Sequence, residues 1–233
     1  MADQLRVGPQ DGPADAAGEL ETTELSLVDN KIGAISELRD LPRMPRLRSL
    51  NLHCNSIASL AGLEPLASLT YLNVSSNRIE AMEGLWPLRR LRTLDLSCNR
   101  IGMIDGIAAL SELRRLNVSY NNIDSLAGLV QCHGGGLETF EAYGNRIASM
   151  RELEYLVGLP RLSELVLARH GARSPVVEAD GYAARARELM PSLARLDGAL
   201  AGDAAPAAAP RVSTLPPPAA PRPVAPTAAA PAL

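Results

Sequence analysis

The residues best suited to chemistry in this sequence are its three cysteines and three histidines. His53, Cys54 and Cys98 are conceivable zinc ligands. Cys132 and His133 precede three glycines, but this segment lacks the Gly-Lys-Ser/Thr of a phosphate-binding loop, so we interpret it as a loop insertion. No acid or nucleophile stands at a catalytic spacing from His133 or from the third histidine. We therefore expect no catalytic residue, no enzymatic activity and no cofactor.

Charge and composition exclude further classes of function. The 233 residues carry 23 Lys and Arg against 26 Asp and Glu, a net charge of −3, which disfavours binding to nucleic acid or to an anionic membrane surface. There is no long apolar run, and residues 1–19 contain no apolar signal segment. Three cysteines are too few, and odd in number, for a disulfide framework. These features predict a soluble cytoplasmic protein.

A recurring asparagine reveals the elements that position all these residues. The asparagine occurs at Asn30, Asn55, Asn77, Asn99, Asn121 and Asn145. The intervals between successive positions are 25, 22, 22, 22 and 24 residues. Apolar residues keep fixed offsets around each one, as in the unit Leu91, Leu94, Leu96, Asn99 and Ile101. This L-x-x-L-x-L-x-x-N-x-I pattern is typical of leucine-rich repeats. A closing copy has His170 in place of the asparagine.

The pattern predicts an α/β leucine-rich repeat solenoid. Each Leu-x-Leu stretch is a short strand of a parallel concave sheet, and the asparagines form a ladder that satisfies backbone groups. Apolar residues at i, i+3 spacing predict short helices or 3-10 turns on the convex face. Glycines at one offset predict a tight turn, and they are Gly62, Gly84, Gly106 and Gly128.

The domain boundaries follow from composition. Residues 1–19 are expected to be a disordered N-terminus, and 20–200 a solenoid of about seven repeats with a C-terminal cap at 182–198. Residues 201–233 are rich in Ala and Pro and are expected to be a disordered tail or linker. In such a solenoid Cys54 and Cys98 are two strand spacings apart, roughly 10 Å, too far to share one zinc ion, so we predict no metal site.

The strand residues that do not enter the core predict a partner-binding surface on the concave face. The candidates are Asn51, His53, Asn73, Ser75, Asp95, Ser97, Asn117, Ser119, Tyr120, Glu141 and Tyr143. They form a polar strip with little charge that suits another protein, and Tyr120 with Tyr143 could make an aromatic platform. The alternative is that this face is only solvated.

Charges predict two further surfaces. A basic rim precedes the strands, with Arg89, Arg90, Arg92, Arg114 and Arg115. Acidic residues follow the strands, namely Glu80, Glu83, Asp105 and Asp124. Such rims would orient an acidic partner such as a tubulin surface, although solvated faces explain the same charges.

The residue sequences of the repeats also resemble those of known families. The 22-residue period resembles the SDS22-like class of leucine-rich repeats. Segments 50–55 (Leu-Asn-Leu-His-Cys-Asn), 94–99 (Leu-Asp-Leu-Ser-Cys-Asn) and 116–121 (Leu-Asn-Val-Ser-Tyr-Asn) resemble the N-terminal repeats of the leucine-rich repeat and coiled-coil centrosomal protein family, which includes the green-algal variable flagella number protein. The resemblance covers roughly residues 22–198.

This resemblance implies a scaffold of centrioles and basal bodies that helps set the position and number of cilia or flagella. The implied partner is a structural protein of the centriole, basal body or axoneme, and the implied location is the cytoskeleton at the centrosome. Family members continue into a coiled coil, whereas no heptads follow the cap here, which favours a fragment of a longer protein over a stand-alone relative. An axonemal dynein light chain and a phosphatase-regulatory subunit are the alternative functions.

Overall fold

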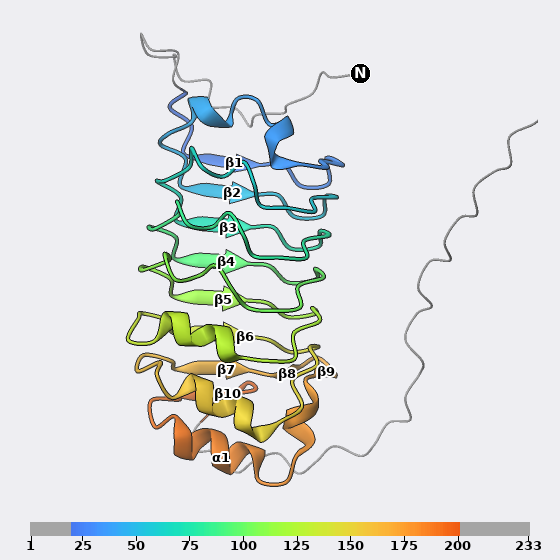
Figure 1. Ribbon diagram of the computed structural model, residues 1–233, viewed down its shortest axis with the longest axis vertical. Coiled ribbons are helices and arrows are strands. Elements are labelled where there is room, and N and C mark those ends of the chain that lie inside the picture. Colours follow the sequence, from blue (N-terminus) through green and yellow to red (C-terminus); the bar gives the residue numbers. More distant parts are fainter. Residues whose placement is uncertain (1–19, 201–233) are drawn as a thin grey trace, which may run out of the picture. The chain divides into compact units, whose positions relative to one another are not determined.

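The computed structural model describes residues 20–200, and the predictions for 1–19 and 201–233 lie outside the described residues. Seven three-residue strands pair in parallel in sequence order, as Figure 1 shows. They are β1 (Glu24–Ser26), β2 (Ser49–Asn51), β3 (Tyr71–Asn73), β4 (Thr93–Asp95), β5 (Arg115–Asn117), β6 (Thr139–Glu141) and β7 (Glu164–Val166). Two strands of the cap extend the sheet, β10 (Arg195–Leu196) in parallel and β11 (Ala199–Leu200) antiparallel. The predicted solenoid fold is confirmed.

The register of the sheet stacks the central residue of each strand on its counterpart. Leu50 pairs with Leu72, Leu72 with Leu94 and Leu94 with Leu116, and these four side chains are buried. Phe140 takes the leucine position in β6 and is completely buried, as its place in the repeat predicts. Because successive strand residues point to opposite faces, the residues on either side of the central one face outward.

The asparagine ladder is confirmed. The Asn77 side-chain amide donates to the carbonyls of Leu52 and Val74 at 3.0 Å and of Ser75 at 3.1 Å, while its oxygen accepts the N–H of Ile57 at 2.9 Å. The amides of Asn55, Asn99, Asn121 and Asn145 likewise tie their own turns to the preceding repeat. Buried backbone groups that leave the strands find hydrogen-bond partners in this way.

The ladder ends at the seventh repeat, where His170 stands in place of asparagine. The chain instead forms a hairpin of β8 (Ala168–Arg169) and β9 (Ala172–Arg173). Ser174 is buried and its hydroxyl donates to the Ala142 carbonyl at 2.8 Å, the acceptor that a further ladder amide would have used. Asp197 accepts the N–H groups of Leu167 and Ala168 at 2.7 and 2.8 Å. Two residues from different segments therefore close the ladder.

The convex side alternates between isolated turns and short helices. In the middle repeats there are single backbone hydrogen bonds from residue i to residue i−3. The Leu88 N–H, for example, donates to the Leu85 carbonyl at 3.0 Å. The 3-10 helices are η1 (Ile35–Glu37), η2 (Leu41–Arg43), η3 (Ala127–Cys132), η4 (Met150–Leu156) and η5 (Pro175–Glu178). The helix α1 (Tyr182–Leu189) belongs to the cap. The i, i+3 spacing thus produces tight turns throughout but continuous helices only toward the two ends.

Gly128 differs from the other three glycines at its offset. Gly62, Gly84 and Gly106 have φ of +105°, +93° and +70°, as a tight turn requires. Gly128 lies within η3 without a positive φ, so the turn prediction is wrong there. A Cβ at Gly128 would lie 1.7 Å from the Ile104 carbonyl oxygen. Close backbone packing, and not a left-handed turn, accounts for glycine at this position.

Candidate partner-binding surface

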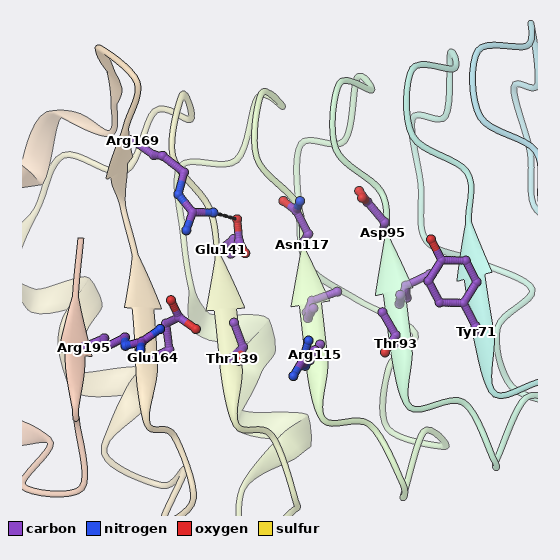
Figure 2. A pocket seen from close by; sticks show the side chains of 12 residues that line it. Tyr71, Thr93, Asp95, Arg115, Asn117, Thr139, Glu141, Glu164, Arg169 and Arg195 are labelled. Atoms are coloured by element: carbon purple, nitrogen blue, oxygen red, sulfur yellow. Dashed lines mark hydrogen bonds and ion pairs between the residues drawn. The ribbon is translucent and has the colours of Figure 1, made fainter. Parts of the chain in front are cut away.

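A groove runs across the concave face over strands β3 to β7 and β10 (Figure 2). Two rows of side chains line it. One row contains Asp95, Asn117 and Glu141 at the ends of their strands, as predicted. The other row stands at the strand starts and was not predicted as a contact surface, and it consists of Tyr71, Thr93, Arg115, Thr139, Glu164 and Arg195.

The predicted contact residues at the strand ends also have a structural role. The Oδ1 atoms of Asn51, Asn73, Asp95 and Asn117 each accept the backbone N–H two residues later, at 3.1, 2.9, 2.9 and 3.0 Å. Such Asx turns are a local alternative to further strand pairing and end each strand. A partner therefore meets the remaining amide nitrogens of the asparagines and the second carboxylate oxygen of Asp95.

The next row, two residues before each ladder asparagine, is largely engaged within the domain. Ser75 is 5 % exposed, and its hydroxyl contacts Asn73 Oδ1 at 2.6 Å and His53 Nδ1 at 2.8 Å. Ser97 donates to Asp95 Oδ1 at 2.7 Å. Ser119 is 0 % exposed. Ser75 and Ser119 therefore lie beneath the surface, and the Ser75 hydroxyl joins two neighbouring side chains.

The C-terminal part of the groove is charged, which departs from the expected strip with little charge. Arg169 from the β8–β9 hairpin reaches Glu141 with an Nη1 to Oε2 distance of 3.0 Å, as Figure 2 shows. Burial raises the pKa of Glu141, the Arg169 guanidinium opposes this shift, and the carboxylates of Glu164 and Asp95 add to it. The ion pair is thus set within a half-buried acidic environment.

Tyr120 and Tyr143 form the expected aromatic pair. Their ring centroids are 5.2 Å apart and the planes meet at 79°, an edge-to-face arrangement. Tyr120 is 43 % exposed and has a φ of +54°. A Cβ on Gly144 would lie 2.9 Å from the Tyr120 ring, so the missing side chain at Gly144 gives the ring its place. Tyr143 lies two residues after Glu141 in the sequence.

The basic rim is partly neutralised. Arg92 contacts Glu112 at 3.0 Å and Arg114 contacts Glu138 at 2.6 Å, so acids of the following repeats lie within the rim. Arg115 is wrongly placed by the sequence prediction, because it belongs to β5 and lines the groove. Its position follows from the alternation of side chains along the strand. Arg89 and Arg90 are exposed at the rim itself.

The cysteines and histidines do not form a chemical centre in the structure. Between residues 20 and 200, no group of three or more His, Cys, Asp and Glu side chains is arranged to hold a metal ion. Cys54 and Cys98 are exposed, with φ of +57° and +55° just before their ladder asparagines. The segment at His133 is a loop insertion, as expected. The Nε2 atom of His133 lies 2.8 Å from the Tyr155 carbonyl oxygen.

Membrane insertion through a helix finds no basis in the described range. None of the helices between residues 20 and 200 combines the length and apolar character needed to cross a bilayer.

Comparison with known proteins agrees with this geometry. The family model described as leucine-rich repeats in two copies matches residues 45–85 and 89–131. The chain contains a leucine-rich repeat domain. Leucine-rich repeat domains generally mediate protein–protein interaction, which fits the open concave face. No curated protein matches the sequence.

Solved structures with this architecture include two internalins of Listeria monocytogenes strain 4b F2365. Internalin InlF is 20 % identical with a TM-score of 0.51, and the match covers 72 % of this chain and 52 % of that one. This chain thus spans about half the length of InlF. Internalin C2 is 22 % identical with a TM-score of 0.44, covering 61 % and 69 % of the two chains. At such identities the likeness to InlF concerns the fold alone.

The second row of the leucine-rich repeat groove could have been found in the sequence. Tyr71, Arg115 and Thr139 stand two residues before members of the predicted row, and residues two apart on a strand share a face. Arg169 carries no such signal, because it lies in a hairpin that replaces the regular turn of the repeat. Arg195 reaches the groove only through the pairing of β10 with β7.

Proposed function

We propose that this domain is a non-enzymatic protein-binding module whose main contact is the C-terminal part of the groove. We call this contact the groove end and define it by Asn117, Glu141 and Arg169, which line the groove, together with the adjacent pair Tyr120 and Tyr143. The observation that carries the proposal is the ion pair between Glu141 and Arg169, set beside two partly exposed tyrosines. Aromatic and arginine side chains dominate the binding energy of protein interfaces.

The groove end differs from the N-terminal half of the concave face in which side-chain groups remain free to contact a partner. In the N-terminal half, His53, Ser75 and Asn73 bond to one another. At the groove end the tyrosine rings offer apolar area that is already ordered by packing, so little conformational entropy is lost on binding. Glu141 and Arg169 offer one acceptor and one donor group, which orient a partner without selecting for strong net charge.

The cellular role that we propose for this module is that of a scaffold at the centriole or basal body. Support comes from the resemblance of segments 50–55, 94–99 and 116–121 to the repeats of the centrosomal family. The partner would be a structural protein of the centriole, basal body or axoneme, and the location the cytoskeleton within the cytoplasm. A tubulin contact through the basic rim has less support, because Arg92 and Arg114 are already paired with glutamates.

The test uses the full chain with an end tag in a flagellated cell, scored by super-resolution microscopy against a centriole-wall marker. One variant combines Glu141→Arg with Arg169→Glu, which keeps an ion pair but reverses its direction. A second is Tyr143→Ala. The matched control is Tyr155→Ala, which removes an exposed tyrosine of η4 outside the groove.

We expect basal-body signal for the unaltered chain and for Tyr155→Ala, and its loss in both groove variants with thermal stability within a few degrees of the unaltered chain. Signal along the axoneme would favour the dynein light-chain alternative. Retained basal-body signal in both groove variants would contradict the proposed contact, and a diffuse signal for the unaltered chain would contradict the cellular role.

A further inference from the structure

A hollow lies at the edge where strands β3, β4 and β5 end, away from the groove. Glu80, Gly102 and Asp124 occupy equivalent positions, three residues after their ladder asparagines, in consecutive repeats. Gly102 has no side chain, and a Cβ there would meet nothing within 4 Å. A gap therefore opens between Glu80 and Asp124. We call it the exit-edge hollow.

The exit-edge hollow is lined by both apolar and acidic side chains. Met103 is 67 % exposed within it, a large fraction for a methionine side chain. Glu83 and Asp105 add two carboxylates to those of Glu80 and Asp124, and none of the described residues that line the hollow is basic. The nearest guanidinium contact is that of Arg100 with Glu80 at 3.9 Å. An occupant must therefore cover apolar surface and carry positive charge.

The same domain presents that chemistry further along the segment that contributes Glu80 and Glu83. Trp86, in the turn segment between β3 and β4, is 62 % exposed. Arg89 and Arg90 follow on the same segment and are exposed, and within residues 20–200 neither makes an ion pair. We call Trp86, Arg89 and Arg90 the entry-edge knob. It combines one large apolar ring with two guanidinium groups whose charge is not neutralised.

We propose that the entry-edge knob of one copy of this chain docks in the exit-edge hollow of a second copy. One segment, between the end of β3 and the start of β4, contributes to both surfaces: Glu80 stands near its beginning and Arg89 and Arg90 stand near its end. Because the strands run in parallel, the beginning and the end of this segment lie toward opposite edges of the sheet. The contact is heterologous: each copy keeps one knob and one hollow open, and copies add in a row or close into a ring. The groove end stays outside the contact.

Analytical ultracentrifugation of the full chain tests this association. The weight-average mass rises beyond that of a dimer with concentration at low salt and returns to the monomer in about 0.5 M NaCl, because exposed charge pairs are screened. The knob variant combines Arg89→Glu with Arg90→Glu. The hollow variant is Gly102→Arg, which fills the gap at a position where an added side chain meets no neighbour.

Mixing the two variants is the decisive step. Each stays monomeric alone, but the knob variant has an intact hollow and the hollow variant an intact knob, so an equimolar mixture forms a 1:1 complex and nothing larger. The control combines Arg151→Glu with Arg161→Glu, which changes the net charge by the same amount at two other exposed arginines and leaves association unchanged.

Three results would overturn the proposal. The first is an unaltered chain that stays monomeric at every concentration. The second is a knob variant that associates as the unaltered chain does. The third is a mixture of the two variants that stays monomeric. Circular dichroism melts of each variant separate these results from loss of folding.

Discussion

A ladder asparagine within the solenoid, such as Asn99, binds backbone groups of two repeats, so its replacement disturbs both. Asn99 accepts the Ile79 N–H at 3.0 Å and donates to the carbonyls of Val74, Leu96 and Ser97. Asn99→Leu leaves these groups without partners and should lower the free energy of unfolding by on the order of 1–3 kcal/mol. Urea denaturation measures this loss, and an unchanged midpoint would contradict the assigned role of the ladder.

Asp95 allows the binding and structural roles of one residue to be separated. Asp95→Asn keeps the Oδ1 acceptor for the Ser97 N–H and hydroxyl while removing the charge. Asp95→Ala removes the acceptor as well and should cost about 1 kcal/mol of stability, as for one lost hydrogen bond. We expect thermal melts to show this order, with Asp95→Asn close to the unaltered chain. Equal destabilisation by both variants would show that the charge, and not the Asx turn, stabilises the strand end.

Two glycines provide a matched steric comparison. Gly128→Ala would place a Cβ 1.7 Å from the Ile104 carbonyl oxygen, so backbone must move, whereas Gly102→Ala meets nothing within 4 Å. Overpacking of this kind costs roughly 1–3 kcal/mol, and more where backbone itself must shift. Chemical denaturation of both variants should show a large loss for Gly128→Ala and little change for Gly102→Ala. Similar losses would point to helix propensity or chain entropy instead.

At the scale of elements, the cap depends on one partly buried carboxylate. Burial raises the pKa of Asp197 above its ordinary value of 3.8, although the N–H groups of Leu167 and Ala168 oppose the shift. The folded state then binds this proton more tightly than the unfolded state, so the contribution of Asp197 to stability is greatest below pH 3.8 and falls as pH rises through the folded pKa. Burial also raises the pKa of Glu141, so the contribution of Glu141 to stability likewise falls as pH rises.

Asp197→Asn tests the cap. The amide keeps an oxygen for the two N–H groups, carries no charge, and tolerates the φ of +52° at this position. We expect a higher melting temperature than that of the unaltered chain at pH 7, by about 2–4 °C for each 1 kcal/mol gained. The difference should narrow on acidification toward pH 4. A lower melting temperature at pH 7 would show that the charge itself stabilises the cap.

The strands and the ladder were predictable because their residues repeat with a fixed period. Leu94, Leu96 and Asn99 recur at the same offsets in neighbouring repeats, and burial in a stack demands such repetition. The convex side was less predictable, since i, i+3 spacing suits a single turn as well as a helix. The hairpin at Ala168–Arg169 carries no periodic signal at all.

At the scale of the whole domain, only part of the candidate site followed from the sequence. The row of Asp95 and Glu141 was expected, but the Asx turn of Asp95 and the ion pair of Glu141 depend on side-chain geometry that spacing does not encode. Arg169 and Arg195 reach the groove through the irregular C-terminal segments. Irregular segments that interrupt a repeat are thus where function-bearing residues escape prediction, because tertiary contacts alone place them.

The order of strands in the sheet has a mechanical consequence. Each strand from β1 to β6 pairs only with its sequence neighbours, and ladder bonds such as that from Asn77 to Leu52 join only adjacent turns. Tension applied to the two ends therefore loads these links in series, and the domain yields one turn at a time. Each yielding turn of 22 residues lengthens the chain by about 70 Å, since extended residues span about 3.4 Å each. A scaffold built this way absorbs a pull by stepwise elongation while its remaining turns stay folded.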